Sequence, residues 1–245
     1  MSVSHLLSVT AELDAPRIFE RSIKLSDGHL ANDRGLVSMD KRALYPGPRN
    51  TLIEACAALG CPDSGALHPH LPQASAVHFG ADGDIGKCYL EFTPDAAPMP
   101  HLVFLAIKWR GDDVRLNYYT GMAHKPHSDK KALVDALIPD GAVRTATHAC
   151  LTLARDGDPD DEAVVLHVTE AGSARASIDI SVADAQQSIS DAATLLIPLF
   201  DAFRLDGKAF FKTSGAARFG HIAAGSDKPG APFAPLYYGA KALCP

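Results

Sequence analysis

Two short segments of this sequence, residues 86–92 and 114–119, carry polar side chains at every second position. In an extended chain, alternate side chains point to the same face. The polar positions are Lys87, Tyr89 and Glu91 in the first segment and Arg115, Asn117 and Tyr119 in the second. Rows of cations, hydroxyls and a carboxylate can bind an anion and transfer a proton. A solvated sheet face would carry the same residue types, so both interpretations stay open at this point.

The elements that must position these rows are strands of β-hairpins. Each polar row follows or precedes a Gly/Asp turn that joins two alternating runs. The predicted strands, about nine in all, are 74–80, 87–92, 102–110, 114–119, 144–155, 163–169, 175–181, 219–225 and 233–241. We therefore expect an α+β fold in one domain spanning residues 1–245. Its antiparallel, barrel-like sheet has about nine or ten strands, and helices pack on the outer apolar face.

Helices are expected between the hairpins. Pro16 suits the first turn of a helix, and the spacing from Thr51 to Glu54 is that of a capping box. Pro198 should kink the longest helix. The expected helical ranges are 14–23, 51–60, 128–138 and about 183–203.

A short pattern recurs near the two ends of the predicted sheet. In the first copy His78 lies on one strand of a hairpin and Tyr89 on the other. In the second copy, the last hairpin, His221 and Tyr237 have the corresponding positions. This echo predicts that the final strand borders an early hairpin and that Tyr237 faces the same cavity as Tyr89. Either histidine could act as an acid or a base in that cavity.

Composition and charge exclude several classes of protein. The net charge of -6, without a basic run, argues against nucleic acid as a partner. The five cysteines have no Cys-x-x-Cys spacing and are interpreted as reduced thiols of a cytoplasmic protein. The first residues lack the features of an export signal, and no apolar run of about 18 residues follows, so no membrane partner is expected.

The sequence predicts no metal site and no common cofactor motif. The closest histidine pairs, His68 with His70 and His124 with His127, lie in connections where no cysteine or carboxylate completes a ligand set. The acidic residues 156–162 depart from the calcium-loop pattern and are interpreted as a solvated hairpin tip. The sequence contains no nucleophile elbow, P-loop or dinucleotide fingerprint.

The Lys-x-Tyr row followed by the Arg-x-Asn-x-Tyr row resembles the corresponding rows of the ABBA aromatic prenyltransferases. In that family the second row is often Arg-x-Lys-x-Tyr. That resemblance implies a ten-stranded antiparallel barrel ringed by helices that binds an allylic diphosphate. It also implies that Glu91 accepts a proton from the aromatic acceptor. The residues implied to hold the diphosphate or complete the ring are Lys87, Tyr89, Arg115, Asn117, Tyr119, Tyr237 and Lys241.

The functional hypothesis is a metal-independent transferase of secondary metabolism that moves a prenyl group from an allylic diphosphate to a small aromatic acceptor. Glu91, His78 and His221 are its candidate catalytic residues, and no cofactor is expected. Two alternatives stay open from the sequence. The same cavity could bind a small molecule without chemistry, or the chain could be a metal enzyme with histidine ligands.

Overall fold

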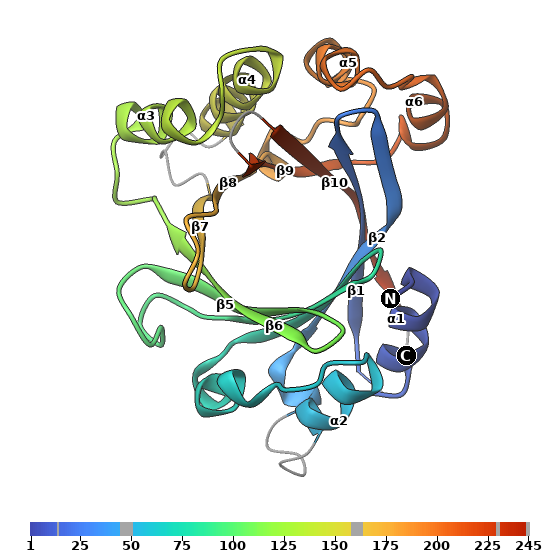
Figure 1. Ribbon diagram of the computed structural model, residues 1–245, viewed down its shortest axis with the longest axis vertical. Coiled ribbons are helices and arrows are strands. Elements are labelled where there is room, and N and C mark those ends of the chain that lie inside the picture. The colour runs from blue at the N-terminus through green and yellow to red at the C-terminus, as the bar shows by residue number, and fades with distance from the viewer. Residues whose placement is uncertain (14, 45–50, 158–163, 229–230, 244–245) are drawn as a thin grey trace.

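The computed structural model describes residues 1–13, 15–44, 51–157, 164–228 and 231–243. Within these residues, ten antiparallel strands close into a barrel in the order β1-β10-β9-β8-β7-β6-β5-β4-β3-β2 (Figure 1). The strands are β1 (Arg17–Ser26), β2 (His29–Asp40), β3 (Ala76–Asp82), β4 (Ile85–Glu91), β5 (Leu102–Arg110), β6 (Asp113–Gly121), β7 (Val165–Glu170), β8 (Ala176–Ser181), β9 (Phe219–Lys228) and β10 (Ala231–Leu243).

The helices lie on the outside of this barrel, as Figure 1 shows in a view along it. The α-helices are α1 (Val3–Ala11), α2 (Thr51–Ala58), α3 (His127–Leu137), α4 (Ala142–Gly157), α5 (Ala193–Ala202) and α6 (Lys208–Ser214). Short 3-10 helices are η1 (Lys41–Ala43), η2 (Gly65–Gln73) and η3 (Ala183–Ala185). None of the helices in the described ranges is long and apolar enough to span a membrane.

The connections give the barrel two different ends. Each odd-numbered strand pairs with the even-numbered strand that follows it, so the connections within these pairs meet at one end; the one after β9 lies outside the described residues. The segments that leave the even-numbered strands, which include most of the helices, meet at the other end. We call these the turn end and the helix end.

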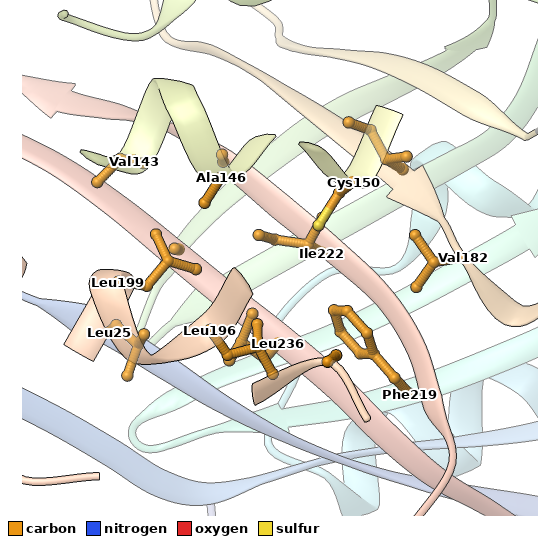
Figure 2. Packing of buried hydrophobic residues seen from close by; sticks show 14 of the residues in the cluster. Leu25, Val143, Ala146, Cys150, Val182, Leu196, Leu199, Phe219, Ile222 and Leu236 are labelled. Carbon is orange, nitrogen blue, oxygen red and sulfur yellow. The ribbon is translucent and has the colours of Figure 1, made fainter. Parts of the chain in front are cut away.

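The hydrophobic core lies between the helices and the outer wall of the barrel. On β4, for example, Cys88 and Leu90 are buried on the outside while Lys87 and Tyr89 line the lumen. One cluster packs under α3 to α6, where Figure 2 shows Cys150 beside Ile222 of β9 and Leu196 beside Leu236 of β10. A second cluster packs under α1, α2 and η2. Since the apolar side chains are used outside, the inner wall is free to carry polar groups.

The predicted fold class is confirmed, including the closed sheet, and so is the place of the last strand. β10 pairs with β1, and Tyr237 and Tyr89 line the same lumen. The echoing patterns also have the same register, because His78 pairs with Tyr89 and His221 pairs with Tyr237.

Three predicted elements were wrong in whole or in part. The helix predicted over 14–23 is the start of β1, whose bulge between Phe19 and Arg21 disturbs the alternation and imitates a helical stripe. Position 14 lies outside the described residues. The strand predicted at 144–155 is α4, since Ala146, Cys150 and Ala154 recur at the helical spacing and are buried.

The helix predicted over about 183–203 is divided. It begins as η3, which Gln186 ends with a left-handed φ of 58°, and continues only from Ala193 as α5. Pro198 lies within α5. Most of the acidic stretch 156–162 lies outside the described residues. The count of about nine strands therefore included one false strand and lacked the whole β1–β2 hairpin.

Candidate active site in the barrel lumen

The lumen contains two cavities that share four lining residues. The cavity toward the turn end has a volume of about 70 Å³, and the cavity toward the helix end has about 270 Å³. The shared residues lie on the even-numbered strands β4, β6, β8 and β10, and are Tyr89, Tyr119, Asp179 and Tyr237. Three tyrosines and one aspartate thus form a layer across the middle of the barrel.

The turn-end cavity is rich in cationic side chains and is called the cationic cavity below. Its lining includes three carboxylates, those of Asp82, Glu170 and Asp179. Among the described residues, five cations line it: Lys24, Arg34, Lys87, Lys108 and Arg175. The excess of positive charge suits an anion that carries more than one negative charge.

Asp82 holds two of these cations in place. Its carboxylate pairs with Arg34 at 2.9 Å and with Lys87 at 3.0 Å. Burial raises the pKa of Asp82, but the charges of Lys87 and Arg34 outweigh it and lower the pKa to about 2. Burial also lowers the pKa of Lys87 to about 8, although Asp82 opposes that shift.

The rows of the sheet place cations next to one another. Lys87 of β4 is opposite Lys108 of β5, and Lys108 is opposite Arg115 of β6. Arg115 is half-exposed and pairs with Asp113 at 2.8 Å and with Glu170 at 3.0 Å. Like charges that face each other across strands are destabilising, so this arrangement has no benefit for folding.

The tyrosine layer separates the two cavities with hydroxyls and ring faces. Tyr89 and Tyr119 meet edge to face with ring centroids 5.6 Å apart. Burial raises the pKa of Tyr89, Tyr119 and Tyr237, so these phenols stay protonated at neutral pH and can donate hydrogen bonds.

The helix-end cavity is called the aromatic cavity below, since Phe104, Leu36 and Leu166 line it together with the tyrosines. His78 also lines it, and the ring of His78 contacts that of Phe104 at 5.5 Å between centroids. The imidazole of His78 bonds to Ser38 Oγ at 2.7 Å and to Glu91 Oε2 at 2.9 Å.

His221 lies on the β9 wall of this cavity. It bonds to Asp179 at 2.7 Å and to Glu20 at 3.3 Å. Burial lowers the pKa of His221, but the two carboxylates outweigh it and raise the pKa to about 10. His221 is therefore an imidazolium at neutral pH, and it partly neutralises both carboxylates.

Most of the residues selected from the sequence come together in the lumen. Those that line a cavity are Lys87, Tyr89, Asn117, Tyr119, Tyr237, His78 and His221. Glu91 reaches the aromatic cavity through its bond to His78, and Arg115 borders the cationic cavity through Glu170. Lys241 is exposed near the end of β10 and is not among the described residues that line either cavity.

Several lining residues were missed. Glu20, Lys24 and Arg34 belong to the hairpin β1–β2, which was not predicted. Lys108, in contrast, lies in a strand that was predicted correctly. The alternation that selected Lys87 on one strand would have selected Lys108 on the next, had the register of the two strands been considered.

The histidine pairs considered for a metal do not form a ligand set. His68 bonds to Ser64 at 3.0 Å, and His124 stacks on His101. In the part of the chain that the structure describes, no three His, Cys, Asp or Glu side chains are arranged to hold a metal ion.

Comparison with solved structures identifies the fold. The chain is similar to PriB in its complex with product diphosphate, with a TM-score of 0.59 and 12% identity, covering 90% of this chain and 79% of PriB. It is similar to the prenyltransferase NotF, with a TM-score of 0.55 and 11% identity over 91% and 80% of the two chains. It is also similar to AnaPT from Neosartorya fischeri, with a TM-score of 0.51 and 12% identity over 90% and 77%.

The sequence itself matches no family model and no curated protein. The likeness is therefore one of architecture. The chain has the fold of the ABBA prenyltransferases.

Proposed function

We propose that this protein transfers a prenyl group from an allylic diphosphate to a small aromatic acceptor, without a metal ion. The observation that carries the proposal is the division of the lumen. A cationic cavity suited to a diphosphate adjoins an aromatic cavity suited to a planar acceptor, and a layer of tyrosines lies between them. Two similar structures agree with this division, since PriB was solved with product diphosphate and NotF with brevianamide F.

The cationic cavity would bind the donor and assist its ionisation. In that step the carbon–oxygen bond to the diphosphate breaks and its electron pair leaves with the diphosphate. Lys87 and Arg34, which line this cavity, would stabilise the charge that develops there, and preorganised charge of this kind is a large source of rate enhancement. The faces of Tyr89 and Tyr119 can stabilise the allylic cation by cation–π attraction.

The aromatic cavity would hold the acceptor next to that cation. An acceptor carbon forms the new bond to the prenyl carbon, and the acceptor then loses the proton from the same carbon or from its N–H or O–H. Two carboxylates can receive it. Glu91 is available behind His78, as the sequence resemblance implied, and Glu20 lines the cavity directly.

The proposal is tested by incubating the protein with dimethylallyl or geranyl diphosphate and a panel of indoles and phenols in the presence of a chelator. We expect products whose mass is increased by one prenyl group. Lys87→Met should abolish turnover, whereas the exposed Lys212→Met should not change it. If no product forms and a thiolodiphosphate analogue of the donor gives no thermal protection, the proposal is wrong, and a binding function without chemistry takes its place.

The proton acceptor is tested with Glu20→Gln and Glu91→Gln, and the exposed Glu54→Gln is the control. Loss of a general base lowers rates by about 10²–10⁴-fold. We expect one of the two variants to lose kcat by that factor while the KM of the donor stays unchanged. Equal, small effects in all three variants would mean that neither carboxylate receives the proton.

A further inference from the structure

Lys108 differs from its neighbours in the cationic cavity in how its charge is balanced. Lys87 and Arg34 share the carboxylate of Asp82, and Arg175 lies 3.7 Å from a carboxylate oxygen of Glu170. The ammonium group of Lys108 instead donates to the side-chain oxygen of Asn117 at 3.0 Å. No carboxylate among the described residues lies within ion-pair distance of it.

The surroundings of Lys108 do not favour a positive charge. Lys87 is opposite it in register, and the cation–π attraction of the Tyr119 ring, 5.6 Å from the ammonium nitrogen, offsets that repulsion only in part. The charged groups that face it in register are Lys87 of β4 and Arg115 of β6, and Arg175, Glu170 and Asp82 also act on it. Burial, followed by repulsion from Lys87 and Arg175, lowers the pKa of Lys108 to about 7. In the empty barrel about half of the molecules would therefore carry a neutral Lys108 at pH 7.

An enclosed lysine without a counter-ion reduces stability, and a methionine or leucine would fill the same space without that cost. Lys108 contributes nothing to the core, because it points into the lumen. Its position is explained if a negatively charged ligand completes the site. An ammonium group has three N–H donors, and those of Lys108 that do not bond to Asn117 can donate to an oxygen of a diphosphate.

We propose that Lys108 binds the diphosphate group of the donor directly and takes up a proton from solvent when the donor binds. The proposal rests on the proposed function, since it assumes that the cationic cavity holds an allylic diphosphate. Two properties follow. Donor affinity depends on Lys108. Donor affinity also decreases as the pH rises above about 7, because a larger share of the lysine is then neutral and its protonation costs binding free energy.

The experiment measures binding, not turnover. The probe is geranyl S-thiolodiphosphate, titrated calorimetrically at pH 7.5 in buffers of different ionisation enthalpy. The variants are Lys108→Gln, which removes the charge, and Lys108→Arg, which keeps it at every accessible pH. The control is the exposed Lys212→Gln. Thermal melts of each variant establish that it is folded.

We expect the wild type to take up roughly three-quarters of a proton at Lys108 on binding, since its pKa is about 7. Lys108→Gln should bind about 10- to 100-fold more weakly, as expected for the loss of a charge-assisted hydrogen bond. Lys108→Arg should bind the probe with an affinity within about threefold of the wild type. It should not show the proton uptake assigned to Lys108, because the arginine is already charged. Lys212→Gln should match the wild type in both measurements.

The proposal is overturned if Lys108→Gln binds the probe as tightly as the wild type, or if Lys108→Arg takes up as many protons. These outcomes are separable from the fate of the proposed function. If binding depends on Lys108 but no acceptor is ever prenylated, the inference stands and the transferase function falls. If products form and Lys108→Gln binds the probe as tightly as the wild type, the transferase function stands and the inference about Lys108 is wrong. If the wild type does not bind the probe, both are wrong.

Discussion

His221 stacks on Tyr237 with the two ring centroids 3.8 Å apart and the ring planes 9° apart. The same imidazole bonds to Asp179 and Glu20, so one residue joins the tyrosine layer to both carboxylates of the aromatic cavity. An imidazolium stacked on an electron-rich ring and held by two carboxylates is favoured in its charged form.

This arrangement predicts how stability depends on pH. The folded-state pKa of His221, about 10, is above its ordinary value of 6.5, so its stabilising effect is complete below pH 6.5 and is lost as the pH rises toward 10. His221→Asn should lower the free energy of unfolding by a few kcal/mol at pH 6, on the order expected for breaking an enclosed ion pair. Denaturant melts from pH 6 to 10 should show this difference shrink. The exposed His29→Asn should show no such trend, and a constant difference for His221→Asn would contradict the prediction.

Asp82 is expected to stabilise the fold while limiting anion affinity. Asp82→Asn leaves Arg34 and Lys87 without their shared carboxylate, which should cost about 3 kcal/mol of stability. The same change frees both cations for a ligand, so inorganic diphosphate should bind more tightly than to the wild type. Thermal melts and calorimetry on one sample measure the two effects. A variant that is less stable and also binds diphosphate more weakly would show that Asp82 positions the cations and does not compete with the ligand.

The acid sensitivity of the wild type should follow from the same carboxylate. The pKa of Asp82 is lowered from 3.8 to about 2, so its contribution to stability is present above pH 3.8 and lost as the pH falls toward 2. Melts of the wild type and Asp82→Asn between pH 5 and 2 should therefore converge. Curves that stay parallel over this range would mean that the ion pair is not formed in solution.

Tyr119 and Tyr118 offer a matched test of the tyrosine layer, since neighbouring residues of β6 face opposite sides of the wall. Tyr119 lines both cavities, whereas Tyr118 packs against the outer core. If the layer shields an allylic cation from water, Tyr119→Leu should raise the ratio of prenyl alcohol to prenylated acceptor several-fold. Tyr118→Leu should alter stability but not this ratio. Mass spectrometry measures the product ratio of each variant. Equal ratios for Tyr119→Leu and Tyr118→Leu would mean that the layer does not shield the cation.

Gly86 is required because Trp109 fills the space of a side chain. A Cβ at position 86 would lie 2.1 Å from Cε2 of Trp109, whose indole N–H donates to the carbonyl of Leu59 at 3.2 Å. Gly86→Ala should destabilise the protein by about 1–3 kcal/mol through overpacking. Trp109 is the single tryptophan of the chain, so its fluorescence reports the displacement directly. Gly121→Ala, whose Cβ would meet a methyl group of Val103 at 3.0 Å, should cost less. An unchanged spectrum and midpoint for Gly86→Ala would refute the prediction.

The sequence was sufficient for the parts of the fold whose pattern is local. The hairpins around Gly83 and Gly111 have regular alternation and turn residues with positive φ, and both were predicted with their polar rows. The hairpin β1–β2 was not, because its bulges interrupt the period of two on which the prediction depends.

The composition of the lumen could be predicted only in part, for a different reason. A polar row can be read along one strand, but the partner of each residue depends on register between strands. Lys87 was selected from its own strand, whereas its pairing with Asp82 and its position opposite Lys108 arise only when three strands are aligned. The charge balance of the cavity is therefore a tertiary property.

The pairing of β1 with β10 also determines when the protein can fold. Ile23 and Leu236 are partners in the sheet although about 210 residues separate them along the chain. At typical rates of synthesis, β1 would leave the ribosome roughly 10–40 s before β10 does. Until then the nascent barrel has two open edges, and its lumen, with all its cations, faces water. A molecule released before its last strand is made should therefore depend on chaperones to avoid association.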